Sequence, residues 1–205
     1  MIWRTFLKEA TTRLHAELDD RLQLLTSAKL NHATYTCILR EFIHVYAQIE
    51  HPLNTHGRQR DELHFLFPYT HTLRLYHDLK TLQVDAPDFT NVPPPLWPDL
   101  HNRDYLLGAI YVIEGSALGG LHLAAHVRAR LSLPPYAGTY FFAPANRERT
   151  LERWHAYLDV LERTAADRTA LSAGACDTFQ RFIDRFASLA PAPGASEEGV
   201  VHVTD

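Results

Sequence analysis

The chain has 205 residues, of which 46% are hydrophobic and 21% charged, and its formal net charge is −4. This length fits one domain, the apolar content excludes a wholly disordered or collagen-like chain, and the negative charge argues against a general nucleic-acid-binding protein. We find no secretory signal, no apolar run that reaches the roughly 18 residues of a membrane span, and no disulfide framework, so we expect a cytoplasmic protein.

Apolar residues recur at helical spacing along most of the chain. The predicted helices span residues 2–25, 31–51, 69–82, 102–131, 147–167 and 170–189. Asn31 is placed to cap the second of them, and Pro52 predicts a stop or kink after it. Five prolines between residues 85 and 100 exclude a regular helix or a central strand there, so we expect a long crossover that packs against the body.

These elements predict an all-α fold, with one domain over residues 1–189 built of helices packed on helices. Residues 190–205 are rich in Pro, Ala and Gly and predict a mobile C-terminal tail. Two segments of the domain carry residue patterns that indicate chemistry.

The first predicted helix carries His15 with polar neighbours at helical spacing. Thr11 and Asp19 lie one turn before and after it, and Lys8 lies about 10 Å away on the same face. Imidazole is the commonest metal ligand, and Asp19 could accept a hydrogen bond from the ring nitrogen that does not ligate. A cation at the distance of Lys8 suits the carboxylates at the edge of a heme. The alternative is an ordinary histidine at the boundary of an amphipathic helix, and spacing alone favours that alternative.

The fourth predicted helix contains glycines at positions 108, 115, 119 and 120. Each glycine inside a helix lowers stability by about 1 kcal/mol relative to alanine, so four lower it by roughly 3–4 kcal/mol. Gly108, Gly115 and Gly119 share one face, which lets the backbone approach either a flat ligand or another helix. The segment has no Walker lysine and follows no predicted strand, so it is not a phosphate-binding loop.

Together these two segments resemble the heme oxygenase family, especially its bacterial members. The resemblance is carried by LKEATTRLHAELD, which includes His15, and by GAIYVIEGSALGG, which runs from Gly108 to Gly120. The aromatic-rich second helix that ends at Ile49–Glu50 and the closing TFQRFIDRF segment also fit. The resemblance covers roughly residues 2–188 and implies an all-α fold with heme between a proximal and a glycine-rich distal helix.

The resemblance also implies which residues hold the heme. The heme-binding residues that it implies are Lys8, Thr11, His15, Asp19, Tyr111, Gly115, Gly119, Gly120 and Arg181. His15 would be the iron ligand, and Lys8 and Tyr111 would bind the propionates, with Arg181 or Arg185 as weaker candidates.

On the distal side, the resemblance implies that Gly115, Ser116 and Gly119 form the catalytic face and that Gly120 helps the helix to kink. Ser116 stands where animal members carry an aspartate, whereas bacterial relatives often have serine there. This difference leaves the route of proton delivery open.

The implied activity is that of a heme oxygenase, in which heme is both cofactor and substrate. O2 and external electrons cleave the ring at a meso carbon and give biliverdin, CO and ferrous iron, with the protein supplying orientation and distal polarity. The electron donor would be a ferredoxin or a flavoprotein reductase, and the biliverdin could pass to a bacterial phytochrome.

Two other interpretations stay open at this point. The first is a di-iron carboxylate bundle, for which the chain offers two Glu-x-x-His motifs and glutamates on two other predicted helices. Its ligands would be Glu41, His44, Glu152, His155, Glu17 and Glu114. The second is a heme-binding module of the same fold that does not degrade heme.

Overall fold

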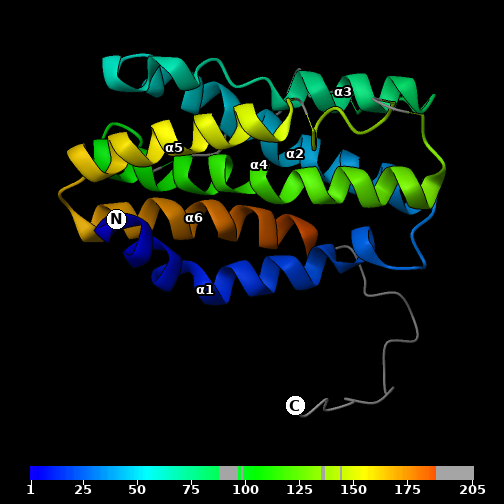
Figure 1. The fold of residues 1–205 in the computed structure, drawn as a ribbon, viewed down its shortest axis with the longest axis horizontal. Coiled ribbons are helices and arrows are strands. Elements are labelled where there is room, and N and C mark those ends of the chain that lie inside the picture. Colours follow the sequence, from blue (N-terminus) through cyan, green and yellow to red (C-terminus); the bar gives the residue numbers. More distant parts are fainter. Residues whose placement is uncertain (88–96, 98, 135–136, 144, 188–205) are drawn as a thin grey trace, which may run out of the picture.

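The computed structural model describes the chain except residues 88–96, 98, 135–136, 144 and 188–205, and the described part is all-helical (Figure 1). Its α-helices are α1 (Ile2–Leu22), α2 (His32–Gly57), α3 (His71–Thr81), α4 (Arg103–Leu131), α5 (Arg147–Thr164) and α6 (Arg168–Phe186). Short 3-10 helices follow α1 and α2, namely η1 (Gln23–Thr26) and η2 (Asp61–Leu66). The predicted all-α class is confirmed.

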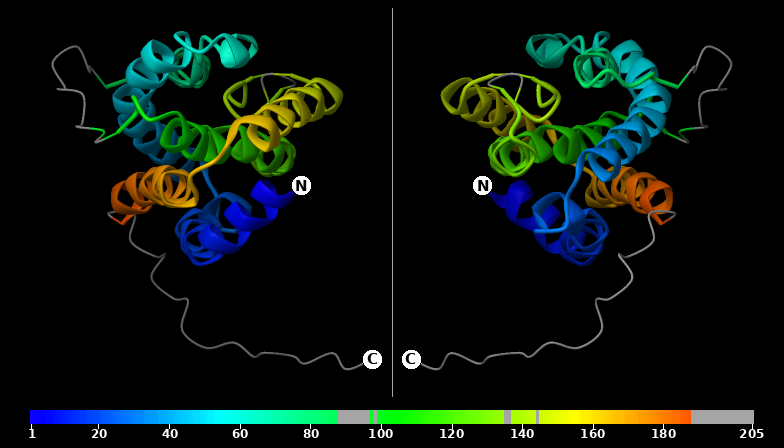
Figure 2. Two further views of the ribbon diagram at one scale, coloured as in Figure 1. Left: turned by 90° about the vertical axis from the view of Figure 1, so that its left-hand side faces the viewer. Right: turned by 90° about the vertical axis from the view of Figure 1, so that its right-hand side faces the viewer.

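Helix α6 organises the fold because it packs against both α4 and α1, and it also contacts α2 (Figures 1 and 2). Two glycines allow α4 and α6 to approach closely. A Cβ atom on Gly108 would overlap the carbonyl oxygen of Leu171, and one on Gly174 would overlap that of Tyr105. Direct backbone contact between the helices therefore requires glycine at both positions.

The core near the C-terminal end of α6 is aromatic. Phe42 of α2 lies 5.1 Å from Phe141 and 4.8 Å from Phe186, measured between ring centroids. Phe182 also contacts Phe42, and its side chain is buried. The phenylalanines at helical spacing in α6 therefore join α2 to the segment before α5.

The predicted helix boundaries hold to within a few residues, with one clear error. Asn31 caps α2 as expected, since its side chain accepts a hydrogen bond from the Thr34 amide at 2.9 Å. Helix α2 does not stop at Pro52 but continues to Gly57. Leu53, directly after the proline, is buried in the core, and this packing offsets the hydrogen bond that proline cannot donate.

Two sequence expectations fall largely outside the described residues. The crossover expected over residues 85–100 is described only at its two ends and at Trp97, where the structure has no regular helix or strand. The tail expected over residues 190–205 lies wholly outside the described part.

Helix α4 corrects the expectation that no run is long and apolar enough to cross a membrane. An 18-residue window within Arg103–Leu131 has a mean hydropathy of 1.4, which meets that requirement by length and composition alone. Half of the window is buried, and α4 packs against α5 and α6. Core helices of globular proteins have the same composition, and α4 is such a helix.

Candidate functional site

His15 lies on the exposed side of α1, with 63% of its side chain accessible. Its Nδ1 atom lies 2.9 Å from an Asp19 carboxylate oxygen, one turn further along the helix. The ring also contacts Phe179 of α6, with 5.6 Å between centroids. Since Nδ1 faces Asp19, Nε2 is the ring nitrogen that would be left to bind a metal, and the carboxylate would hold the ring in one orientation.

The other residues of α1 divide between two faces. Lys8 is exposed, as His15 and Asp19 are, so these three side chains share the open face of the helix. Thr11 instead lies on the buried face, where its hydroxyl donates to the Leu7 carbonyl oxygen at 2.8 Å. The structure therefore gives Thr11 a packing role and leaves the open face to the charged side chains and the imidazole.

The glycines of α4 also divide into two pairs. Packing explains Gly108, described above, and Gly120, where a Cβ atom would lie 2.6 Å from the carbonyl oxygen of Phe142. Packing does not explain the other two. A Cβ atom on Gly115 would meet only the Trp154 ring, at an ordinary 3.7 Å, and one on Gly119 would meet no protein atom within 4 Å.

The protein itself therefore has room for side chains at Gly115 and Gly119. Because glycine lowers helix stability and the neighbouring residues do not require it, a ligand against this face accounts for both positions. Gly119 and Ser116 are exposed, so the face is accessible to such a ligand. This observation fits a flat group such as heme, whose ring needs close approach of the helix backbone.

The hydroxyl group of Ser116, which follows Gly115, influences a buried tyrosine of α2. It donates to the Ile113 carbonyl oxygen at 2.8 Å and lowers the pKa of Tyr46. The Tyr46 ring is buried and stacks on His71, with centroids 4.4 Å apart and planes inclined by 15°. Burial raises the pKa of Tyr46, and the Ser116 hydroxyl opposes that shift.

His71, on which Tyr46 stacks, forms a largely buried pair with Glu50. The Nδ1 atom of His71 lies 3.3 Å from a Glu50 oxygen, and the His71 backbone amide donates to the same carboxylate. Burial lowers the pKa of His71, although Glu50 acts in the opposite direction. No sequence motif assigned a functional role to Tyr46, His71 or Glu50. The available signal was the spacing of Tyr46 and Glu50, which places both on one face of α2.

A second buried charge lies one residue before the open glycines. Glu114 accepts hydrogen bonds from the Arg153 guanidinium at 2.8 Å on each oxygen, and from the Tyr69 hydroxyl at 2.7 Å. Only 4% of Glu114 is accessible. This network ties α4 to α5 and to the segment before α3, so it holds the glycine helix in place.

The residues expected to bind the heme propionates lie in different places in the structure. Tyr111 is half-buried against Trp154, with 5.6 Å between centroids, and the charge of Arg4 from α1 opposes the rise that burial causes in its pKa. Tyr111 therefore lies near the start of α1. Arg181 lies over the Trp97 ring at 4.7 Å. It follows Phe179, the residue that meets His15, by two positions, so it projects from nearly the opposite side of α6.

Comparison with known proteins decides the family. A sequence profile described as Heme oxygenase matches residues 4–188. The chain belongs to the heme oxygenase family. Its structure is similar to that of a heme oxygenase from Leptospira interrogans, with a TM-score of 0.67 and 20% identity, covering 91% of this chain and 99% of that chain. At this identity the second likeness is one of fold, and no curated protein matches the sequence.

Membership of the heme oxygenase family identifies the chain as an enzyme that degrades heme. Members use heme and O2 with electrons from a reductase, and cleavage to biliverdin is their general reaction. The expectation from the two sequence segments is therefore confirmed at the level of family and activity.

The di-iron interpretation is wrong, because the described residues contain no group of three or more His, Cys, Asp or Glu that could hold a metal ion. All six proposed ligands lie in the described part. Glu41 is paired with Arg185, and Glu114 with Arg153. Glu17 lies 3.9 Å from Arg13 on the surface of α1. These three glutamates pair with three different arginines and do not share a carboxylate-bridged centre.

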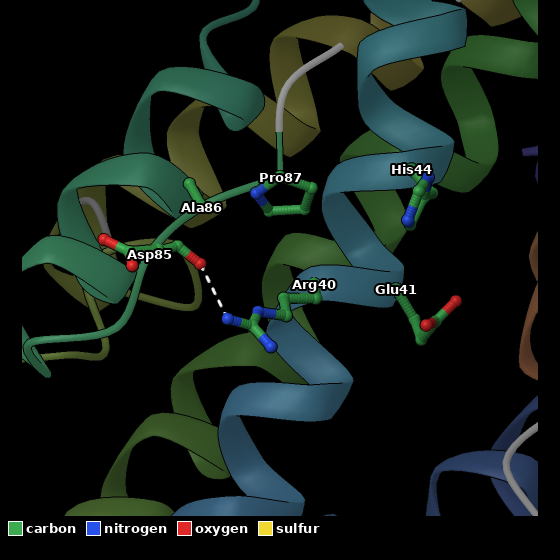
Figure 3. A pocket seen from close by; sticks show the side chains of 6 residues that line it. All are labelled: Arg40, Glu41, His44, Asp85, Ala86 and Pro87. Carbon is green, nitrogen blue, oxygen red and sulfur yellow. Dashed lines mark hydrogen bonds between the residues drawn. The ribbon is translucent and has the colours of Figure 1, made fainter.

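One of the Glu-x-x-His motifs lines a pocket of about 300 Å³ beside α2 (Figure 3). Its lining residues are Arg40, Glu41, His44, Asp85, Ala86 and Pro87. Arg40 donates to the Asp85 carbonyl oxygen at 2.8 Å, as the dashed line in Figure 3 shows. The pocket includes neither His15 nor any α4 glycine, so it is separate from the candidate heme site.

Proposed function

We propose that the heme of this enzyme is held between the exposed face of α1 and the glycine face of α4. His15 ligates the iron through Nε2, while Asp19 accepts from Nδ1 and so holds the neutral ring in one orientation. The observation that carries the proposal is the open space at Gly115 and Gly119, which packing within the protein leaves unexplained. Bound heme would supply the iron that activates O2 and the ring that is oxidised.

The distal residues have distinct roles in this proposal. Gly115 and Gly119 would let the α4 backbone lie close to the ring, and this helix face would restrict the space in which O2 binds. Ser116 and Tyr46 hold a proton-donating hydroxyl pair at this face, so no carboxylate is needed there. Burial keeps Tyr46 protonated and able to donate.

At the edge of the ring, Lys8 binds a propionate and Tyr111 contributes a hydroxyl group. Arg4 joins them, because its charge acts on Tyr111 across the space between α1 and α4. Arg181 is left out of this group, since it already lies over Trp97. Gly120 serves the close contact with Phe142 in an α4 that is helical throughout Arg103–Leu131, and the proposal needs no kink there.

For the reaction partners, we propose a ferredoxin or a flavoprotein reductase as the electron donor and a bacterial phytochrome as one acceptor of biliverdin. A cytoplasmic location fits these partners and the two free cysteines, Cys37 and Cys176, since thiols stay reduced there.

The test is reconstitution with hemin, followed by ascorbate or a ferredoxin–reductase pair under air. We expect a Soret band that decays as biliverdin absorption grows. His15→Ala should lose the coordinated spectrum and the turnover, whereas His32→Ala, which removes an exposed histidine at the start of α2, should behave as the unmodified protein. A stable Soret band with every reductant would instead indicate a non-catalytic heme-binding module.

A further inference from the structure

Helix α1 has no N-terminal cap of its own. Its N-cap residue is Met1, which provides no side-chain hydrogen bond, and its first turn contains no acidic residue. The first amides of a helix have no partner within the helix and need one from elsewhere. Here Glu162 of α5 supplies it, since its carboxylate accepts from the amides of Ile2, Trp3 and Arg4 at 2.9, 2.9 and 3.1 Å.

The location of Glu162 is unfavourable for its own helix. It lies in the last turn of α5, where the helix dipole disfavours a negative charge. The same carboxylate lies at the N-terminus of α1, where the dipole favours it. The charge therefore stabilises the start of α1 at the expense of the end of α5.

Arg168 shows the same pattern with the opposite sign. It is the first residue of α6, where the helix dipole disfavours a positive charge. Its guanidinium carbon lies 5.1 Å from the Phe6 ring centroid and 5.9 Å from that of Trp3, both on α1. Figure 1 places the start of α1 at the same end of the molecule as the connection between α5 and α6.

We propose that Glu162 and Arg168 form a clamp that positions the heme-holding helix, so that Glu162 controls how tightly the enzyme retains its heme. This inference rests on the proposed placement of heme against α1. The buried residues of α1 are Leu7, Thr11 and Leu14, the helix packs mainly against α6, and the side that we assign to heme is exposed. Glu162 adds an attachment at the end of the helix, which restricts its movement relative to α6.

The clamp acts at the end of α1 that meets the edge of the ring. The Arg4 backbone amide donates a hydrogen bond to Glu162, and the charge of the Arg4 side chain lowers the pKa of Tyr111 of α4. Lys8 follows one turn later on the same face, about 6 Å along the axis. Loosening the first turn therefore disturbs the propionate-binding group more than it disturbs His15, and Glu162 is a positioning residue.

The experiment uses the full chain with Glu162→Ala, Glu162→Gln and a matched control, Asn146→Ala. Asn146 caps the other end of α5 by accepting from the Arg149 amide at 2.9 Å, so its loss also removes a helix cap. Two quantities are measured: hydrogen exchange of the first turn of α1 in the heme-free protein, and the rate of heme transfer to excess apomyoglobin.

We expect Glu162→Ala to speed exchange in the first turn of α1 and to speed heme loss about fivefold, the size expected when a helix loses its cap. The Soret band should keep its position because His15 still ligates the iron. Glu162→Gln should show exchange and heme-loss rates between those of the unmodified protein and Glu162→Ala, since its one side-chain oxygen can still accept a hydrogen bond. Asn146→Ala should lower stability similarly and leave heme loss unchanged.

Equal heme-loss rates in Glu162→Ala and Asn146→Ala at similar stability would overturn the clamp. Failure of the heme placement itself has a different signature, namely an unchanged Soret band in His15→Ala. Hydrogen exchange in the heme-free protein shows whether Glu162 stabilises the first turn of α1, whatever the result for His15→Ala.

Discussion

The substitution Gly119→Ala tests whether this glycine is needed for packing within the protein or for space that a ligand occupies. A Cβ atom at this position meets no protein atom within 4 Å, so the substitution introduces no clash. Alanine is more favourable than glycine inside a helix by about 1 kcal/mol. The heme-free protein should therefore become more stable by about 1 kcal/mol, which corresponds to a rise in Tm of roughly 2–4 °C for a domain of this size.

The same methyl group occupies the space that we assign to the distal face of the heme. We expect biliverdin formation to slow about 10- to 100-fold, since small displacements of reacting groups have effects of that size. Thermal unfolding of the heme-free protein and single-turnover spectra of the loaded protein measure the two effects separately.

Gly108→Ala is the matched control, because its Cβ would overlap the Leu171 carbonyl oxygen. It should destabilise the heme-free protein by about 1–3 kcal/mol, as overpacking does. If Gly119→Ala stabilises the protein and leaves turnover unchanged, the open glycine face does not hold the heme. If it destabilises the protein, the space at Gly119 is not available in solution.

Three further outcomes follow from the buried polar groups. Tyr46→Phe keeps the ring and removes the hydroxyl beside Ser116, so turnover should slow about 10- to 100-fold with little change in a heme titration; unchanged turnover would remove Tyr46 from the distal group. Arg153→Ala leaves the Glu114 carboxylate with one donor and should lower stability in urea by about 2 kcal/mol, less than for a fully buried pair because Arg153 is partly exposed; a loss under about 0.5 kcal/mol would contradict this. Burial lowers the folded-state pKa of His71 below 6.5, so the unfolded chain takes up the proton first as the pH falls, and the free energy of unfolding should decrease below about pH 6.5. His71→Asn should reduce that slope, and an equal slope in both proteins would show that His71 does not contribute.

Local sequence patterns were sufficient for the helices and for the contact between His15 and Asp19. The periodicity that places His15 and Asp19 one turn apart is a property of α1 alone, and the structure gives them the expected contact. The prediction that the second helix ends at Pro52 was wrong, because burial of the next residue, Leu53, stabilises a helix that proline alone would disfavour.

The four glycines show why sequence alone left packing and ligand binding open. All lie in one helix, but only their neighbours from other elements distinguish them. Gly108 faces α6 and Gly120 faces Phe142, whereas a Cβ atom on Gly115 would meet only the Trp154 ring at ordinary contact distance and one on Gly119 would meet no protein atom within 4 Å. Those neighbours lie far away in the sequence, so spacing along α4 could not reveal the difference.

Tertiary packing also explains why the sequence did not join Tyr46 to Ser116 and why it suggested di-iron ligands. Tyr46 and Ser116 come together only through the packing of α2 against α4, so no local pattern joins them. Conversely, Glu41 and Glu114 fit a ligand motif by spacing but are neutralised by Arg185 and Arg153 from other helices. Local spacing identifies donor atoms, and tertiary packing decides which partners they receive.

The most direct test of the account is His15→Gly loaded with heme, with and without added imidazole. We predict that the variant loses the coordinated Soret band and biliverdin formation, and that imidazole restores the band because a free ligand can replace the exposed side chain. A spectrum and turnover equal to those of the unmodified protein would show that the iron is held elsewhere, and would contradict the placement of heme between α1 and α4.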